Sequence, residues 1–264
     1  MKSRKSFKES TRDYLDFAVQ TAREAGQLTL DYFQKSISVE LKNDLSPVTE
    51  ADRRTEELIR NRIKYTFPEH AIIGEEFGAS GGTGKKQRWI VDPIDGTRSF
   101  IRGIPTYGVL IALEIDGQCV VGVVYLPALG EMVAAAIGEG CWWNNRPARV
   151  STIPTVEEGI LVHANAASFE NYGKREEWNR LQHSLQHCIG FSDAYGYVLV
   201  ATGRAEVAID PFMREWDCGP FPAIFSEAGG YFGDWRGNKT IYGGEEMATS
   251  QKLLPEVLRV IQGK

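Results

Sequence analysis

The segment Trp89-Ile90-Val91-Asp92-Pro93-Ile94-Asp95-Gly96-Thr97 carries more information about the fold than any other stretch of the chain. Its first three residues are bulky and favour a buried β-strand. Two carboxylates, Asp92 and Asp95, follow three residues apart, where the strand is expected to end and the backbone to turn. The segment therefore predicts a strand that delivers two acidic side chains to one site.

The residues around these two acids favour a phosphate-binding turn. Pro93 fixes one backbone angle and lacks a donor, whereas Gly96 lets the backbone approach a ligand closely. If a helix begins near Thr97, its free N–H groups point outward and favour an anion such as phosphate. Because carboxylates and phosphate repel each other, the pattern predicts divalent cations between them. Hard oxygen ligands favour Mg²⁺ over zinc or copper.

Acidic residues recur at the ends of other predicted elements. Glu75 follows a short apolar strand at residues 71–73, and Asp217 precedes an apolar run that ends at residues 228–230. A D-P-x-D-G motif alone fits a strand ending in a turn about equally well, and one Asp at a helix start is usually only a cap. Acids from three separate segments favour a metal site.

Thr49 and Asp52 have the spacing of a capping box, in which a hydroxyl and a carboxylate satisfy the first N–H groups of a helix. Taken alone, this structural interpretation is favoured. The functional alternative is that Asp52 hydrogen-bonds the Thr97 hydroxyl and that the two side chains polarise a water bound to the metal, as a positioned general base would.

The flanking segments predict alternating helices and strands. Apolar residues three and four apart favour helices, and the Asp116-Gly117 pair favours a tight hairpin turn. Residues 78–84, rich in glycine, are predicted to form a loop. The elements predicted in this way are helices at 14–33, 49–67 and 194–202 and from about 217 and 251, and strands at 71–73, 89–91, 107–115, 118–126, 159–163 and 206–209.

This pattern predicts an α/β protein in which mixed sheets are layered with helices. Residues 1–264 are assigned to a single domain, with lobes at about 1–152 and 153–264 and a boundary near residues 151–158. The first lobe contains Glu75 and the segment 92–97, and the second contains Asp217.

Composition narrows the function classes. The chain has 30 basic and 35 acidic side chains and a net charge of −5, so no global positive field attracts nucleic acid or an acidic membrane surface. The expected partner is a small molecule. Four widely spaced cysteines favour neither a disulfide framework nor a zinc site, and we expect them to be reduced. No membrane span or signal peptide is recognised, which predicts a soluble protein, and the reduced cysteines predict a cytoplasmic location.

Three other patterns are weaker. Gly84-Lys85 follows a glycine-rich run, as in a phosphate-binding P-loop, but two positions of that motif differ. His183 and His187 are expected to share one helix face, but no third metal ligand accompanies them. Trp142 and Trp143 could stack on a nucleobase, although packing is favoured.

Together these motifs resemble a known family, the inositol monophosphatase-like phosphatases. The hallmarks of that family are G-E-E, D-P-[IL]-D-G-[ST], and W-D followed by E-A-G-G. All occur here in order, at residues 74–76, 92–97, 216–217 and 227–230. The resemblance extends from about residue 13 to residue 261. It implies a layered α-β-α-β-α sugar-phosphatase-type fold, Mg²⁺ dependence, sensitivity to Li⁺ and, usually, a homodimer.

The resemblance also implies roles for individual residues. Asp52 and Thr97 would align the attacking water, with Glu75 as a further catalytic residue, and the amides of Gly96 and Thr97 would receive the phosphate. The expected ligands of one Mg²⁺ are Glu75, Asp92 and the Ile94 carbonyl, and those of a second are Asp92, Asp95 and Asp217.

Within the family, the resemblance is greatest to histidinol-phosphate phosphatases, through residues 46–53, 96–100, 193–197 and 233–237. It implies hydrolysis of L-histidinol phosphate, a step of histidine biosynthesis. Asp193 and Asp210 match positions that contact the organic part of the substrate, although Asp193 could merely cap the helix expected from residue 194. The sequence departs from the family pattern at Gly219-Pro220 and at Arg98, and neither departure changes an expected metal ligand.

The sequence leaves other functions open. An inositol-1-monophosphatase or a 3′-phosphonucleotide phosphatase would use the same metal site, and the sequence separates these substrates poorly. A catalytically inactive metal-binding scaffold is a further alternative. It predicts the loss of a metal ligand or of Thr97, and all of these residues are present.

Overall fold

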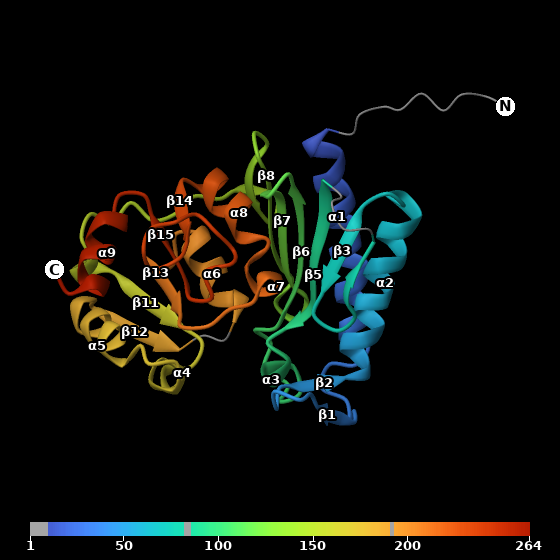
Figure 1. Cartoon of the computed structure of the whole chain (residues 1–264), viewed down its shortest axis with the longest axis horizontal. Coiled ribbons are helices and arrows are strands. Elements are labelled where there is room, and N and C mark those ends of the chain that lie inside the picture. Colours follow the sequence, from blue (N-terminus) through green and yellow to red (C-terminus); the bar gives the residue numbers. More distant parts are fainter. Residues whose placement is uncertain (1–9, 82–85, 191–192) are drawn as a thin grey trace.

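The computed structural model describes residues 10–81, 86–190 and 193–264. Helices alternate with two mixed sheets in five layers, as Figure 1 shows. The prediction of an α/β protein in which mixed sheets are layered with helices is therefore confirmed. The N-terminal residues 1–9 and the Gly84-Lys85 pair lie outside the described residues.

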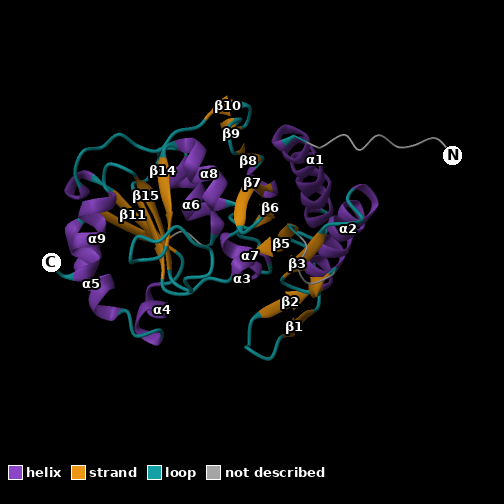
Figure 2. Ribbon diagram, turned by 45° about the horizontal axis from the view of Figure 1, so that its top comes forward, coloured by secondary structure: helices purple, strands orange, loops and turns teal. Residues whose placement is uncertain are grey.

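The larger sheet has eight strands in the order β10-β9-β8-β7-β6-β5-β3-β4. All neighbouring pairs are antiparallel except β3 and β5, which run parallel (Figure 2). Its strands are β3 (Ala71–Gly74), β4 (Gly78–Ser80), β5 (Gln87–Asp95), β6 (Gly108–Ile115), β7 (Gln118–Leu126), β8 (Glu131–Ala136), β9 (Gly140–Trp143) and β10 (Arg146–Pro147).

The smaller sheet has five strands in the order β12-β11-β13-β15-β14, with β11 parallel to both of its neighbours. A separate two-stranded hairpin, β1 with β2, precedes the second helix. The bounds are β1 (Val39–Leu41), β2 (Pro47–Thr49), β11 (Ile160–His163), β12 (His187–Gly190), β13 (Val207–Asp210), β14 (Gly230–Gly233) and β15 (Glu246–Ser250).

Helices cover both sheets and fill the space between them. On the outer face of the larger sheet lie α1 (Thr11–Leu30) and α2 (Glu50–Thr66). Between the sheets lie α6 (Ala194–Ala201) and α8 (Phe221–Ala228). The smaller sheet is covered on its outer face by α4 (Ala166–Asn171), α5 (Arg175–Ser184) and α9 (Leu254–Gln262), and two short helices are α3 (Thr97–Phe100) and α7 (Glu215–Cys218).

The sequence explains these positions. In α1 the buried alanines Ala18, Ala22 and Ala25 form one narrow stripe, so the helix lies close against the sheet. In α6 nearly every residue is apolar and buried, as expected for a helix enclosed between two sheets. One hydrophobic cluster includes Ile90 of the larger sheet and Val162 of the smaller one. The division into two lobes remains a prediction.

Most predicted elements are present with shifted ends. The hairpin turn is confirmed, since Asp116 and Gly117 both have positive φ, at 51° and 83°. A capping box at Ser10 starts α1 three residues before the predicted start. The final helix begins at Leu254 rather than near Gln251, and the helix expected from Asp217 is divided into α7 and α8.

Three expectations were wrong. Residues 78–80 of the predicted loop form the edge strand β4, which pairs with β3. His187 does not share a helix face with His183, because α5 ends at Ser184 and His187 begins β12. Asp92 does not lie beyond the end of a strand, because β5 continues to Asp95. In each case strand pairing with distant residues overrides the local pattern.

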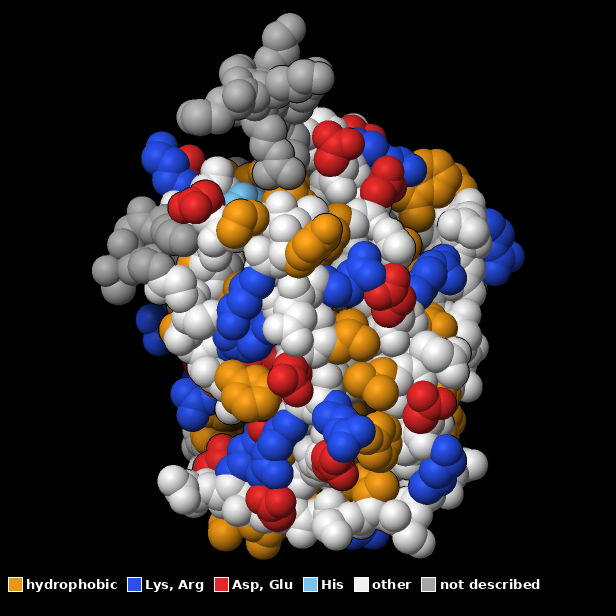
Figure 3. All heavy atoms as spheres, turned by 90° about the vertical axis from the view of Figure 1, so that its right-hand side faces the viewer, with side chains coloured by type: hydrophobic (Ala, Val, Ile, Leu, Met, Phe, Trp, Pro, Cys, Tyr) orange, Lys and Arg blue, Asp and Glu red, His pale blue; other side chains and the backbone are white. Residues whose placement is uncertain are grey.

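The surface mixes charges of both signs. Figure 3 shows one side of the molecule, on which basic and acidic side chains are interspersed. Among the described residues, no helix is long and apolar enough to cross a membrane. All four cysteines are free, and only Cys188 is exposed. The expectation that nucleic acid is not a partner remains a prediction.

Gly122→Ala should destabilise the protein, because β7 touches the start of α8 at this residue. A Cβ atom at Gly122 would lie 2.0 Å from the backbone oxygen of Pro220, so the helix would have to move. We expect a loss of ~1–3 kcal/mol in the free energy of unfolding, measured by urea denaturation. Gly190→Ala is the control, since its nearest neighbour would be 3.5 Å away. Equal midpoints for the two variants would contradict this packing.

Candidate active site

A bulge in β5 brings Asp92 and Asp95 to the same side of the sheet. Residues three apart in a regular strand face opposite ways. Here Asp92 pairs with Leu110 and Asp95 with Gly108, so β5 has one extra residue between these pairs. Pro93 lies in this interval and donates no hydrogen bond, and the Asp92 carboxylate accepts the N–H of Ile94 at 3.0 Å. Asp92 and Asp95 therefore converge, as predicted.

Asp217 of α7 completes a cluster with these two acids. One carboxylate oxygen from each of Asp92, Asp95 and Asp217 lies within 4.8 Å of the others, an arrangement that could hold a metal ion. Burial raises the pKa of Asp217 to about 7. Burial, followed by the charge of neighbouring carboxylates, raises the pKa of Asp92 and Asp95 well above their usual range. A cation among them would relieve this repulsion.

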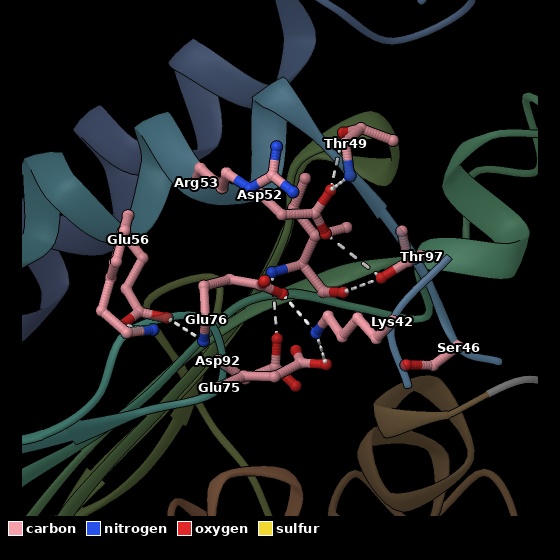
Figure 4. A network of polar contacts seen from close by, with 12 residues as sticks. Lys42, Ser46, Thr49, Asp52, Arg53, Glu56, Glu75, Glu76, Asp92 and Thr97 are labelled. Atoms are coloured by element: carbon pink, nitrogen blue, oxygen red, sulfur yellow. Dashed lines mark hydrogen bonds and ion pairs between the residues drawn. The ribbon is translucent and has the colours of Figure 1, made fainter. Parts of the chain in front are cut away.

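Glu75, in the turn after β3, lies beside this cluster of three aspartates. Its carboxyl group lies within hydrogen-bond reach of Asp92. Lys42, between β1 and β2, donates hydrogen bonds to Glu75 at 2.7 Å and to Glu76 at 2.6 Å (Figure 4). Burial alone would lower the pKa of Lys42, but these hydrogen bonds raise it above its ordinary value. Burial raises the pKa of Glu76 to about 7.

The donor set fits a divalent cation that prefers oxygen ligands. Every side chain in the cluster is a carboxylate, and sulfur and imidazole ligands are absent from it. Lys42 can balance only part of the charge of four neighbouring acids. The Ile94 carbonyl, an expected metal ligand, accepts the Thr97 hydroxyl at 3.1 Å.

Asp52 makes the contacts that both interpretations from the sequence require. One carboxylate oxygen accepts the N–H and hydroxyl of Thr49, at 2.7 and 2.6 Å, so the capping box is confirmed. The other accepts the Thr97 hydroxyl at 3.2 Å. Burial raises the pKa of Asp52, which favours a carboxylate that can take up a proton. The interpretations are compatible because each uses a different oxygen.

Gly96 allows a close approach of two segments. Its φ of 82° is in the region that favours glycine, and a Cβ atom there would lie 2.5 Å from the Asp193 carboxylate. Thr97 follows as the first residue of α3. The structure thus places the backbone expected to receive phosphate directly beside Asp193.

Asp193 does not cap α6, so that alternative was wrong. Its side chain makes no capping hydrogen bond, and Asp95 instead accepts the N–H of Ala194 at 2.6 Å. Asp193 has an uncommon backbone conformation, with φ 61° and ψ −145°. Burial raises its pKa to about 6, and the charge of Arg98 opposes this shift.

Asp210 lies at the end of β13 in the same pocket. It accepts the N–H of Ala164 at 3.1 Å, and burial raises its pKa to about 7. The pocket has a volume of ~180 Å³, and its acidic lining residues are Asp95, Asp193, Asp210 and Asp217. The expected substrate residues Asp193 and Asp210 therefore share one pocket with the expected metal ligands Asp95 and Asp217.

The rim of this pocket includes residues that the sequence did not reveal. The rings of Tyr172 and Phe212 stack with centroids 4.8 Å apart, and the Arg214 guanidinium lies 4.8 Å from the centre of the Phe212 ring. Lys42 was also missed. None of these residues belongs to a motif or a periodic pattern, so no signal in one sequence identifies them.

The fold and the acidic cluster define a class of metal-dependent phosphatases, and comparison with known proteins identifies the family. The model of the inositol monophosphatase family matches residues 10–263, so the chain belongs to this family of phosphatases. It is 43% identical to a histidinol-phosphatase of Chlorobaculum parvum, over 91% of this chain and 93% of that protein. A histidinol-phosphatase of Mycobacterium tuberculosis is 35% identical, over 94% and 97% of the two chains.

Solved structures agree with this assignment. An inositol monophosphatase from Anabaena has a TM-score of 0.85 and 27% identity, and the match covers 96% of both chains. The family resemblance predicted from the sequence is therefore confirmed, as is its closeness to histidinol-phosphatases.

Asp92→Asn should abolish turnover while the protein stays folded. The amide keeps the acceptor for Ile94 but removes the charge that a cation requires. Phosphate release and the circular dichroism melting curve measure the two effects. Asp116→Asn in the hairpin turn is the control and should retain activity. Near-normal activity of Asp92→Asn at saturating Mg²⁺ would contradict the metal role.

Thr97→Ala should lower kcat by ~10²-fold or more, with a smaller effect on KM, because it removes the hydroxyl held by Asp52. Steady-state kinetics at saturating metal measure both constants. Thr66→Ala, at the exposed end of α2, is the matched control. If only KM rose, Thr97 would be a phosphate ligand with no part in activating water.

Proposed function

We propose that this phosphatase hydrolyses L-histidinol phosphate to L-histidinol and phosphate, with Mg²⁺ as its cofactor. The observation that carries the proposal is the continuous pocket in which Asp193 and Asp210 lie beside the cluster of Asp95 and Asp217. Negative charge beyond the metal cluster suits a substrate whose organic part is cationic. The names of the similar proteins from Chlorobaculum parvum and Mycobacterium tuberculosis support the same substrate.

Two groups of ligands are assigned to Mg²⁺ in this proposal. Bound there, Mg²⁺ would neutralise the phosphate and stabilise the charge that develops on its oxygens. The ligands are Glu75, Asp92 and the Ile94 carbonyl for one ion, and Asp92, Asp95 and Asp217 for the other. The oxygen-only donor set and the mutual proximity of the three aspartates support this assignment.

The protein's own groups position the reactants. The amides of Gly96 and Thr97 bind the phosphate at the start of α3. The Thr97 hydroxyl, held by Asp52 at 3.2 Å, orients the attacking water; it takes one proton from that water as it passes its own proton to Asp52. Glu75, which accepts a hydrogen bond from Lys42, is a further catalytic residue in this proposal.

Substrate selection is assigned to Asp193 and Asp210. Histidinol phosphate carries a primary ammonium and an imidazole that is partly protonated near neutral pH. A carboxylate that faces these groups gains a charge-assisted hydrogen bond. Inositol offers only hydroxyl groups, so the same carboxylates would remain buried without a cationic partner.

Purified enzyme tests the proposal directly. We expect kcat/KM to be greatest for histidinol phosphate when it is compared with inositol 1-phosphate and a 3′-phosphonucleotide under the same Mg²⁺ conditions. A greater kcat/KM for either of the other two esters would contradict the proposal and identify that ester as the preferred substrate. No turnover of any ester would favour a metal-binding scaffold.

Other features also belong to the proposal. We expect a homodimer, inhibition by Li⁺, a cytoplasmic location and a place in histidine biosynthesis. Light scattering gives the oligomeric state, and inhibition by LiCl at fixed Mg²⁺ tests the lithium expectation.

Asp193→Asn should separate the two kinds of substrate. The side chain keeps its shape but loses its charge, so kcat/KM for histidinol phosphate should fall by an amount equivalent to ~1.5–3 kcal/mol. Activity on glycerol phosphate, which lacks a cationic group, should change little and serves as the control. Equal losses on both esters, or no loss on either, would remove Asp193 from substrate selection.

A further inference from the structure

One face of α2 connects the parts of the active site. Asp52, Glu56 and Arg60 are four residues apart, so their side chains lie on the same side of the helix. All three are buried, with exposures of 0%, 0% and 5%. Asp52 contacts Thr97, but neither Glu56 nor Arg60 has a role in the proposed chemistry. Two buried charges need an explanation.

Glu56 holds the backbone of the turn that carries Glu75. One of its carboxylate oxygens accepts the N–H of Glu76 at 2.7 Å, and the other accepts the N–H of Phe77 at 3.2 Å (Figure 4). The approach is close, because a Cβ atom at Gly74 would lie 2.2 Å from the same carboxylate. Glu75 is thus flanked on both sides by residues that touch Glu56.

Arg60 extends this contact to the next strand. It donates to Glu56 at 2.6 Å and to the Ser80 hydroxyl at 2.9 Å, and it also donates to the Gly78 carbonyl. The Glu56–Arg60 pair therefore holds β4 as well as the turn after β3. Since three donors already occupy the Glu56 carboxylate, it is committed to the protein and does not face the acidic cluster.

We propose that Glu56 is a positioning residue for Glu75. It fixes the turn that carries Glu75 against α2, the same helix that places Asp52 beside Thr97. In this way α2 sets the distance between Glu75 and the Asp52–Thr97 pair. The inference rests on the proposed metal role of Glu75. Substitution of a residue that orients a metal ligand typically lowers metal affinity or activity by about 10- to 100-fold.

Glu56→Gln tests this role by direct metal binding. The amide can accept one N–H group, but its NH₂ cannot accept the second, and Arg60 loses its counter-charge. Mn²⁺, which also prefers oxygen ligands, is the probe, and electron paramagnetic resonance counts the free ion. We expect the Kd for Mn²⁺ to rise about 10- to 100-fold, while kcat at saturating metal falls by only a few-fold.

The control is Glu57→Gln, on the exposed side of α2, which should bind Mn²⁺ as the unmodified protein does. A lowered Tm with unchanged Kd in Glu56→Gln would show a purely structural role and overturn the inference. If that variant fails to fold, Arg60→Lys keeps a cation beside Glu56 but loses the fork that reaches β4. It should raise the Kd in the same direction, and an unchanged Kd would overturn the proposal.

The metal assignment and the role of Glu56 can be contradicted separately. If the unmodified protein does not bind Mn²⁺, the metal assignment of the proposed function is wrong. If it binds Mn²⁺ and Asp92→Asn does not, but Glu56→Gln binds normally, only the role of Glu56 is wrong.

Discussion

Repulsion between buried carboxylates is the constraint on which the site depends. Asp92 and Asp95 are buried and Asp217 lies half-buried beside them, so their charged forms are costly without a cation. Such an arrangement persists only if the surrounding packing prevents the groups from separating. The bulge in β5 and the helices between the two sheets supply that rigidity, and Lys42 supplies one positive charge.

The sequence predicted the parts of this arrangement that depend on local pattern. The strand before Asp92, the helix beginning at Thr49 and the hairpin at Asp116-Gly117 follow from periodicity and turn chemistry, so they could be recognised without a partner. The bulge between Asp92 and Asp95 could not, because it exists only relative to β6. The edge strand β4 was missed for the same reason.

Hydrogen bonds and ion pairs between residues far apart in the sequence explain what was predicted wrongly or missed in the site. Asp193 precedes a helix and has the residue type of a cap, yet Asp95, almost a hundred positions earlier, takes the Ala194 N–H. Asp193 is thereby released to face the pocket in a conformation that costs backbone energy. Lys42 likewise reaches Glu75 across the structure. A single sequence contains the residue types but not these distances.

Most of the acids in the proposed metal site and those in the proposed substrate site come from different layers of the fold. Asp52, Asp92 and Asp95 are held by α2 and β5, whereas Asp210 ends β13 of the other sheet and Asp193 precedes α6. Within the described part of the chain, Asp217 is the one member of the three-aspartate cluster that comes from the second half of the sequence. Substitutions at the end of β13 can therefore change the organic group that fits without moving the bulge in β5. The same fold can in this way serve phosphatases with different substrates, because most of the acids that would bind metal and those that would choose the ester come from different elements.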